Sequence, residues 1–126
     1  KTLFIMSENI IQTKSFDFAV DIIETYKLLI AEKKEYILSK QLLRSGTSIG
    51  ANISEAVRGQ SAKDFIHKLQ ISRKEANETL YWIKLLEKTE YIPLETTKAL
   101  IMKCEEILKI LTSIIKTSEA KTKRYR

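Results

Sequence analysis

Apolar residues recur at three- and four-residue steps along the chain, in four segments that short polar breaks separate. This spacing places apolar side chains on one face of an α-helix, whereas a half-buried strand needs alternation at every second residue. Only one proline and three glycines occur among 126 residues, and a β-rich fold of this length needs many more turn residues. Because short connections join antiparallel neighbours, the sequence predicts an all-α, antiparallel up-down four-helix bundle.

The breaks define four predicted helices. The first covers about residues 16–31, with Ser15 as its N-cap. The second begins at residue 37 or 39 and ends near Arg58, before Gly59. The third covers about residues 62–88 after the cap Ser61, and the fourth begins near Pro93. The predicted apolar stripe of the first helix consists of Phe16, Ala19, Val20, Ile23, Tyr26 and Ile30. That of the fourth consists of Leu100, Cys104, Ile107, Leu108, Leu111, Ile114 and Ile115.

These limits divide the chain into three parts. Residues 1–14 are predicted to be an N-terminal extension, 15–115 the four-helix bundle domain, and 116–126 a frayed, basic C-terminal tail. Met6 is an alternative start, which would make residues 1–5 an upstream extension. No apolar run approaches the roughly 18 residues that a membrane span requires, so no membrane partner is expected.

Positive charge is concentrated in the tail. The formal net charge is +6, and residues 116–126 contribute five basic residues and one acidic residue, hence +4. One interpretation is a tail that binds RNA or DNA, and the alternative is a solvated end that aids solubility. The residues predicted to contact phosphate are Lys121, Lys123, Arg124 and Arg126, with Lys14, Arg58, Lys63 and Lys68 as weaker candidates. Tyr125 is predicted to stack on a base.

The second helix has two faces of different character. Its predicted core face consists of Leu38, Leu42, Ile49, Ile53 and Ala56. Gly46 and Gly50 lie along one flank at four-residue spacing, which leaves a strip without side chains where another helix can approach closely.

The opposite face is polar and carries short side chains. It consists of Arg44, Ser48, Asn52 and Glu55. A solvated helix face usually favours long Lys and Glu side chains, whereas serine and asparagine compete with the backbone for hydrogen bonds. We interpret this face as a contact for a second subunit or a ligand, and an ordinary exposed face is the alternative.

The third helix is predicted to carry a surface that matches the polar face of the second helix. Its core stripe consists of Phe65, Leu69, Ser72, Ala76, Leu80 and Ile83. Beside it, Glu75, Glu78 and Trp82 form a ladder. Trp82 is either a core-edge residue whose indole N–H is bound by Glu78 or an interface anchor. Arg44 is expected to pair with Glu75 or Glu78, within or between chains. Surplus apolar surface at Ile71 and Leu85 also favours a homo-oligomer.

Residues that would support catalysis are sparse. His67 is the only histidine, and Asp64-x-x-His67 is one half of the paired motif that a carboxylate di-iron bundle needs. Cys104, the only cysteine, lies in an apolar stripe and fits a core residue in a reducing cytoplasm. We therefore predict a cytoplasmic protein that is not an enzyme, with no metal, no cofactor and no small-molecule substrate.

Two stretches resemble a known family. They are "QLLRSGTSIGANISEA" (41–56) and "KDFIHKLQISRKEANETLYWI" (63–83). The residues that carry the likeness are Gln41, Arg44, Ser45, Ser48, Ile49, Asn52, Glu55, Phe65, Glu75, Ala76 and Glu78. Over residues 15–115 the chain resembles the four-helix bundle family that includes the intervening-sequence proteins encoded within bacterial large-subunit ribosomal RNA genes. It departs from many relatives at Gly50, where they have proline, and at Ala56, where they have glycine.

The resemblance implies closed antiparallel bundles that assemble into a five-fold ring, with an unresolved biochemical role. A related accessory protein of retroelements is a basic pentameric barrel that binds a reverse transcriptase and nucleic acid. By this analogy the expected function is that of a non-enzymatic, homo-oligomeric scaffold that binds RNA or DNA, with a pentamer as the expected assembly. The alternative is a protein-interaction adaptor, such as a partner of a polymerase or reverse transcriptase, without nucleic-acid binding of its own.

Overall fold

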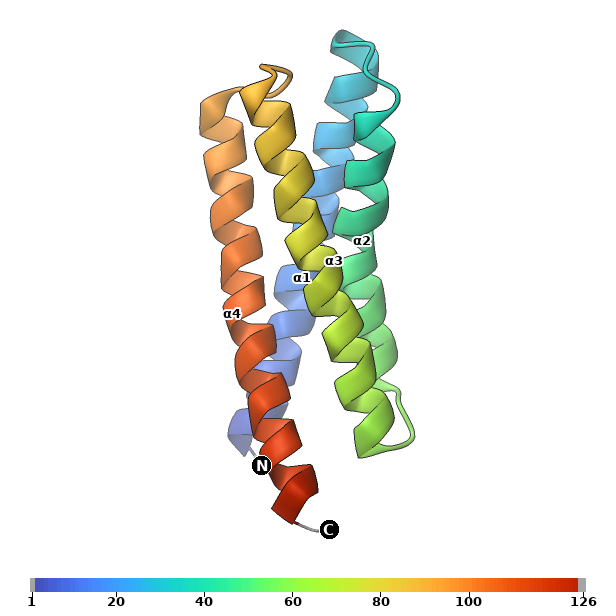
Figure 1. Ribbon diagram of the computed structural model, residues 1–126, viewed down its shortest axis with the longest axis vertical. Coiled ribbons are helices and arrows are strands. Elements are labelled where there is room, and N and C mark those ends of the chain that lie inside the picture. The colour runs from blue at the N-terminus through green and yellow to red at the C-terminus, as the bar shows by residue number, and fades with distance from the viewer. Residues whose placement is uncertain (1, 125–126) are drawn as a thin grey trace.

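A computed structural model describes the backbone of residues 2–124 and the side chains of residues 8–123. It contains four helices: α1 (Thr2–Glu32), α2 (Leu38–Val57), α3 (Ala62–Lys88) and α4 (Leu94–Arg124). They lie side by side around one core, and consecutive helices run in opposite directions, which is compatible with the expected up-down topology (Figure 1). The predicted all-α four-helix bundle is confirmed.

Short loops with side-chain caps set the starts of α2 and α3. Before α2, Oε1 of Glu35 accepts a hydrogen bond from the backbone N–H of Ser39 at 2.7 Å. At the start of α3, Oγ of Ser61 accepts from the backbone N–H of Asp64 at 3.1 Å, as the sequence predicts. These caps satisfy amide groups that the first turn of a helix leaves without partners.

The outer helices are longer than the sequence predicts. Helix α1 begins at Thr2 instead of residue 16, and α4 continues to Arg124 through most of the segment expected to fray. Ser15 is therefore not an N-cap. It lies inside α1, where it is buried and its hydroxyl donates to the carbonyl oxygen of Gln12 at 3.1 Å. The helices run through residues 14–15 and 115–116, and the domain limits proposed there stay predictions.

The predicted apolar stripe of α1 is wrong. Three of its six members are exposed, at 69% for Phe16, 42% for Val20 and 37% for Ile23, and none of the six is fully buried. The buried face is rotated around the helix and consists of Ile11, Ser15, Phe18, Ile22, Thr25 and Leu29. Two of these six residues are polar, so a search for apolar spacing does not favour this face.

The other three helices bury the faces that the sequence predicts. Leu42, Ile49, Ile53 and Ala56 of α2 are buried, and Leu38 is partly buried against the core. On α3, Leu69, Ser72, Ala76 and Ile83 are buried, and Phe65 and Leu80 pack against the core from its edge. The predicted stripe of α4 is also buried, with Leu108 partly so.

The glycine strip of α2 is occupied by α1. A Cβ atom at Gly46 would lie 2.8 Å from both γ carbons of Ile22, and one at Gly50 would lie 3.3 Å from the carbonyl oxygen and Oγ of Ser15. The close approach predicted at these two positions is confirmed, and it takes place within the chain.

Hydroxyl groups link α3 to α2 inside the bundle. Oγ of Ser72 donates to the carbonyl oxygen of Ile49 at 2.8 Å, and Oγ1 of Thr79 lies 3.0 Å from Oγ of Ser45. All three hydroxyl-bearing residues are fully buried. These bonds satisfy polar groups in a region that water does not reach. Within residues 2–124, no helix combines the length and apolarity needed to cross a bilayer.

Candidate functional site

Two surfaces contain the predicted site residues. The polar face lies on α2 and α3 and consists of Arg44, Ser48, Asn52, Glu55, Glu75, Glu78 and Trp82. The basic end is the end of the bundle where α2 finishes, α3 begins and α4 finishes (Figure 1). Its described predicted residues are Arg58, Lys63, Lys121 and Lys123.

An ion-pair network connects the two helices of the polar face. Nη1 of Arg44 on α2 lies 3.3 Å from Oε1 of Glu75, and Nη2 also donates to Oε2 of Glu78. The expected pairing is thus present within one chain. The Glu75 side chain is only 17% exposed and that of Arg44 is 50% exposed, so the network lies at the boundary between core and solvent.

Trp82 completes this network as a core-edge residue. Its Nε1 donates to Oε2 of Glu78 at 3.0 Å, which is the partner that the sequence predicts. The indole packs against the hydrophobic core and meets the ring of Tyr81 edge-on, with centroids 5.0 Å apart. Glu78 therefore accepts from both an arginine and an indole, and its carboxylate fixes both side chains.

The short side chains of the polar face bind one another along α2. Nδ2 of Asn52 donates to the carbonyl oxygen of Ser48 at 2.8 Å and lies 3.0 Å from its Oγ. Near the C-terminal end of α2, Oε1 of Glu55 lies 3.0 Å from Nζ of Lys68 on α3 and forms an ion pair with it. The polar face is thus satisfied within the chain, and its role as a contact for a second subunit or a ligand stays a prediction.

The structure brings two predicted phosphate ligands together at the basic end. Lys63 of α3 and Lys123 of α4 line one cavity of about 410 Å³ between these helices. Ile66, His67, Gln70, Glu119 and Thr122 complete its lining. Arg58, at the end of α2, and Lys121 are exposed. The side chain of Arg124 and the whole of Tyr125 and Arg126 lie outside the described part of the chain, and their predicted roles stay predictions.

Two of the weaker phosphate candidates have acidic partners. Lys14 pairs with Glu106 of α4 at 3.1 Å, and Lys68 pairs with Glu55 as above. Each of these lysines bridges two neighbouring helices. We therefore leave both out of the basic end.

The Cys104 thiol lies in an environment that makes it unreactive. The residue is fully buried, and its Sγ donates to the carbonyl oxygen of Ala76 at 3.4 Å, which confirms it as a core residue. Burial, and then the negative charge of Glu105, raise the pKa of this thiol to about 12. Since the thiolate is the nucleophile, Cys104 stays unreactive near neutral pH. Among the described residues, no three His, Cys, Asp or Glu side chains converge on a metal-sized site.

Sequence reasoning missed an apolar groove on α1. A groove of about 370 Å³ runs between α1 and α2, and its apolar lining includes Phe16, Ala19, Ile23 and Ala51. Assigning Phe16 and Ile23 to the core concealed this surface. The available signal was the glycine pair of α2, which indicates that another helix packs closely on that strip, and Ser15 and Ile22 of α1 occupy it.

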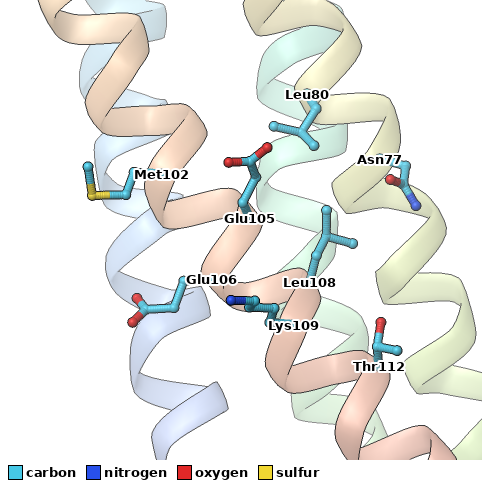
Figure 2. A pocket seen from close by; sticks show the side chains of 8 residues that line it. All are labelled: Asn77, Leu80, Met102, Glu105, Glu106, Leu108, Lys109 and Thr112. Atoms are coloured by element: carbon cyan, nitrogen blue, oxygen red, sulfur yellow. The ribbon is translucent and has the colours of Figure 1, made fainter.

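A second groove lies between α3 and α4. It measures about 900 Å³, and Figure 2 shows Asn77 and Leu80 on α3 and Glu105, Leu108 and Thr112 on α4 along it. Its lining mixes acidic, basic, amide and apolar side chains. None of the predicted site residues lines this groove.

Comparisons with known proteins agree with the four-helix architecture. A sequence model of the 23S rRNA-intervening sequence protein family matches residues 7–113 of the chain. One similar crystal structure is a protein with unknown function from the S23 ribosomal protein family of Bacteroides thetaiotaomicron. It is 55% identical to this chain, with a TM-score of 0.86 over 87% of this chain and 98% of the other. A comparison with curated proteins found no match.

Proposed function

The chain belongs to the 23S rRNA-intervening sequence protein family, and from this premise we propose that it is a non-enzymatic scaffold that binds RNA through its basic end. One observation carries the proposal: Lys63 and Lys123, from opposite halves of the chain, line the same cavity. Exposed Arg58 directly follows α2, and α2 finishes at the end of the bundle where α3 begins (Figure 1).

The charge distribution supports a phosphate ligand. The last 11 residues contribute +4 of the formal net charge of +6. Residues 116–124 of this segment form the final turns of α4, which share a cavity with the start of α3. Lysine and arginine side chains that bind phosphate release condensed counterions, so binding of this kind weakens steeply as salt rises.

Salt dependence tests this proposal directly. Fluorescence anisotropy with a labelled single-stranded RNA, measured from 50 to 300 mM salt, compares the wild type with the double variant Lys63→Gln/Lys123→Gln. Loss of two phosphate contacts should reduce the slope of log affinity against log salt by about 1.4. The matched control is Lys88→Gln/Lys98→Gln, which removes two exposed lysines at the other end of the bundle and should leave the slope unchanged.

Two results would contradict RNA binding at the basic end. The first is a wild type that does not bind at 50 mM salt, and the second is an equal slope for the two double variants. Circular dichroism must first show the same helical content in all three proteins, so that a loss of binding is not a loss of fold. A DNA strand of the same sequence, measured alongside, reveals whether the 2′-hydroxyl contributes.

We further propose that the chain forms a homo-oligomer through its apolar α1 surface. Phe16, Val20 and Ile23 are exposed on α1 and continue into the groove between α1 and α2. Contiguous apolar patches on soluble proteins commonly mark interaction sites. Assembly would place several basic ends in one particle, which multiplies weak phosphate contacts. A pentameric ring is the arrangement expected from the family resemblance.

Size-exclusion chromatography with light scattering tests assembly. The wild type should elute as an oligomer with and without nuclease treatment. Phe16→Ser should elute as a smaller particle, with a lower molar mass by light scattering. Leu94→Ser, which changes another exposed apolar residue away from the groove, is the control. A monomeric wild type at 10 µM or higher would refute self-association.

The same apolar surface also favours the adaptor alternative, in which the chain binds a protein such as a polymerase and no nucleic acid. A monomeric chain that retains such a protein after nuclease treatment, and loses it with Phe16→Ser, would support the adaptor over the RNA-binding scaffold.

A further inference from the structure

The cavity at the basic end carries a negative charge among its positive ones. On α3, Lys63, Ile66, His67 and Gln70 follow at three- and four-residue steps and so share one helix face. On α4, Glu119, Thr122 and Lys123 share the face opposite. A carboxylate in the lining would weaken the binding of phosphate alone, because its negative charge repels that of the phosphate. Glu119 therefore indicates that a second chemical group is recognised.

Hydrogen bonding holds the Glu119 carboxylate across the cavity. Nε2 of Gln70 donates to Oε2 of Glu119 at 3.3 Å, which connects the two helices. An ionised carboxylate has about four acceptor positions on its two oxygens. This bond uses one of them and leaves both oxygens able to accept further hydrogen bonds. The carboxylate thus suits a ligand that presents two adjacent donors.

We propose that this cavity receives one unpaired guanine base of an RNA strand, an inference that rests on the RNA binding proposed above. Glu119 accepts hydrogen bonds from guanine N1–H and N2–H, and Ile66 contacts the face of the base. Lys63 and Lys123 bind the phosphates on either side of this nucleotide. A volume of about 410 Å³ lies within the range of small-ligand pockets, roughly 300–1,000 Å³, and is ample for one base.

Base chemistry favours guanine over the other three bases. The Watson–Crick edge of guanine carries two neighbouring donors, N1–H and N2–H, and a carboxylate can accept both at once. Adenine and cytosine place a ring acceptor beside their amino donor, and uracil places its single N3–H between two carbonyl oxygens. Those acceptors would face a negative charge. The Watson–Crick edge is free only in an unpaired base, so the ligand is single-stranded RNA.

Four oligonucleotides test the base preference. Each is a labelled decamer of uridine with guanosine, adenosine, cytidine or uridine at one central position, and binding is measured by anisotropy at 50 mM salt. The guanosine decamer should bind about tenfold more tightly than the others, as expected for a good paired contact to a base edge. In Glu119→Gln the preference should fall to twofold or less, because the amide offers one acceptor in place of two.

A matched control separates the carboxylate contact from overall charge. Glu105→Gln removes one negative charge from the same helix outside this cavity and should keep the tenfold preference. Free guanosine monophosphate should compete at least tenfold more weakly than the guanosine decamer, because it brings only one phosphate. Equal competition would identify the free nucleotide as the ligand and overturn the assignment to RNA.

The failure of this inference differs from the failure of the proposed function. Equal binding of all four decamers, or a guanosine preference that persists in Glu119→Gln, overturns the guanine site and leaves RNA binding standing. If none of the decamers binds to the wild type at 50 mM salt, RNA binding fails and the guanine site fails with it.

Discussion

Replacing Gly46 by alanine should destabilise the fold, although alanine is the better helix former. The new Cβ would lie 2.8 Å from Cγ1 and Cγ2 of Ile22 and 3.2 Å from its Cβ. Favourable contacts between carbon atoms need about 3.5–4.0 Å, so a shift of roughly 0.7 Å or more is required. Ile22 is fully buried, and its branched Cβ restricts rotation about χ1. The strain must therefore be relieved by moving α1 away from α2.

The expected net loss follows from two opposing terms. Glycine to alanine inside a helix stabilises by about 1 kcal/mol. Overpacking a core costs about 1–3 kcal/mol, and contact with two γ carbons of a rigid side chain places this site in the upper half of that range. The free energy of unfolding should therefore fall by about 1–2 kcal/mol. Gly50→Ala, whose Cβ would lie 3.3 Å from Ser15, needs a smaller adjustment and should stay within about 0.5 kcal/mol of wild type.

Urea unfolding, followed by circular dichroism at a fixed protein concentration, measures these changes. The sharpest comparison repeats Gly46→Ala in an Ile22→Ala background, which lacks both γ carbons. Ile22→Ala alone should cost about 2–5 kcal/mol. In that background Gly46→Ala should become stabilising, by less than the roughly 1 kcal/mol of helix propensity, because the γ-carbon clash is gone and only the contact with the Cβ of residue 22, at 3.2 Å, remains. A stabilising Gly46→Ala in the wild type, or the same change in both backgrounds, would refute the reasoning.

Three further substitutions test other contacts. Ser72→Ala removes the hydrogen bond to the carbonyl oxygen of Ile49 and should lower the free energy of unfolding in urea by about 1 kcal/mol. Arg44→Gln and Glu78→Gln, made singly and together, should show a coupling of about 0.5–1 kcal/mol because the pair is partly exposed, and additive effects would reject the coupling. Native Cys104 should resist alkylation at pH 8, because its pKa is raised to about 12, and should react once urea unfolds the chain. Because the unfolded thiol ionises at lower pH, wild-type stability should fall relative to Cys104→Ala as pH rises from about 9 to 12, and parallel pH profiles would contradict this.

Where apolar and polar faces contrast strongly, the sequence was a reliable guide to the fold. Ser61 caps α3, and α4 begins immediately after Pro93, because caps and prolines act through local backbone chemistry. The glycine strip of α2 also predicted a close neighbour, because a stacked pair of glycines in a helix is costly unless a neighbouring helix packs into the space.

Helix α1 shows why apolar spacing can select the wrong face. Its buried face includes Ser15 and Thr25, whose hydroxyls donate to the carbonyl oxygens of Gln12 at 3.1 Å and Asp21 at 2.8 Å. Those bonds within the helix satisfy both hydroxyls, so burying them costs little. The predicted face of α1 contains Phe16 and so has a higher apolar content than the buried face, although Phe16 itself is exposed.

The two surfaces differ in how far sequence reasoning can reach. The contact of Trp82 with Glu78 follows from a four-residue step on one helix, and Arg44 meets Glu78 because α2 and α3 are consecutive. The cavity between Lys63 and Lys123 depends instead on the length of α4. Because α4 was predicted to end at residue 115, Lys123 had no predicted position. The sequence therefore could not predict that Lys123 shares a cavity with Lys63 of α3.

Buried hydroxyls fix how α2 and α3 are aligned along their axes. Sliding one helix by a single turn, about 5.4 Å, would separate Ser72 from the Ile49 carbonyl and Thr79 from Ser45. A purely aliphatic seam tolerates several alignments of similar energy, whereas a hydroxyl stranded without a partner costs about 1–3 kcal/mol. Helices α2 and α3 are therefore expected to move as one rigid unit. Conformational fluctuations of the bundle should displace α1 or α4 relative to this pair.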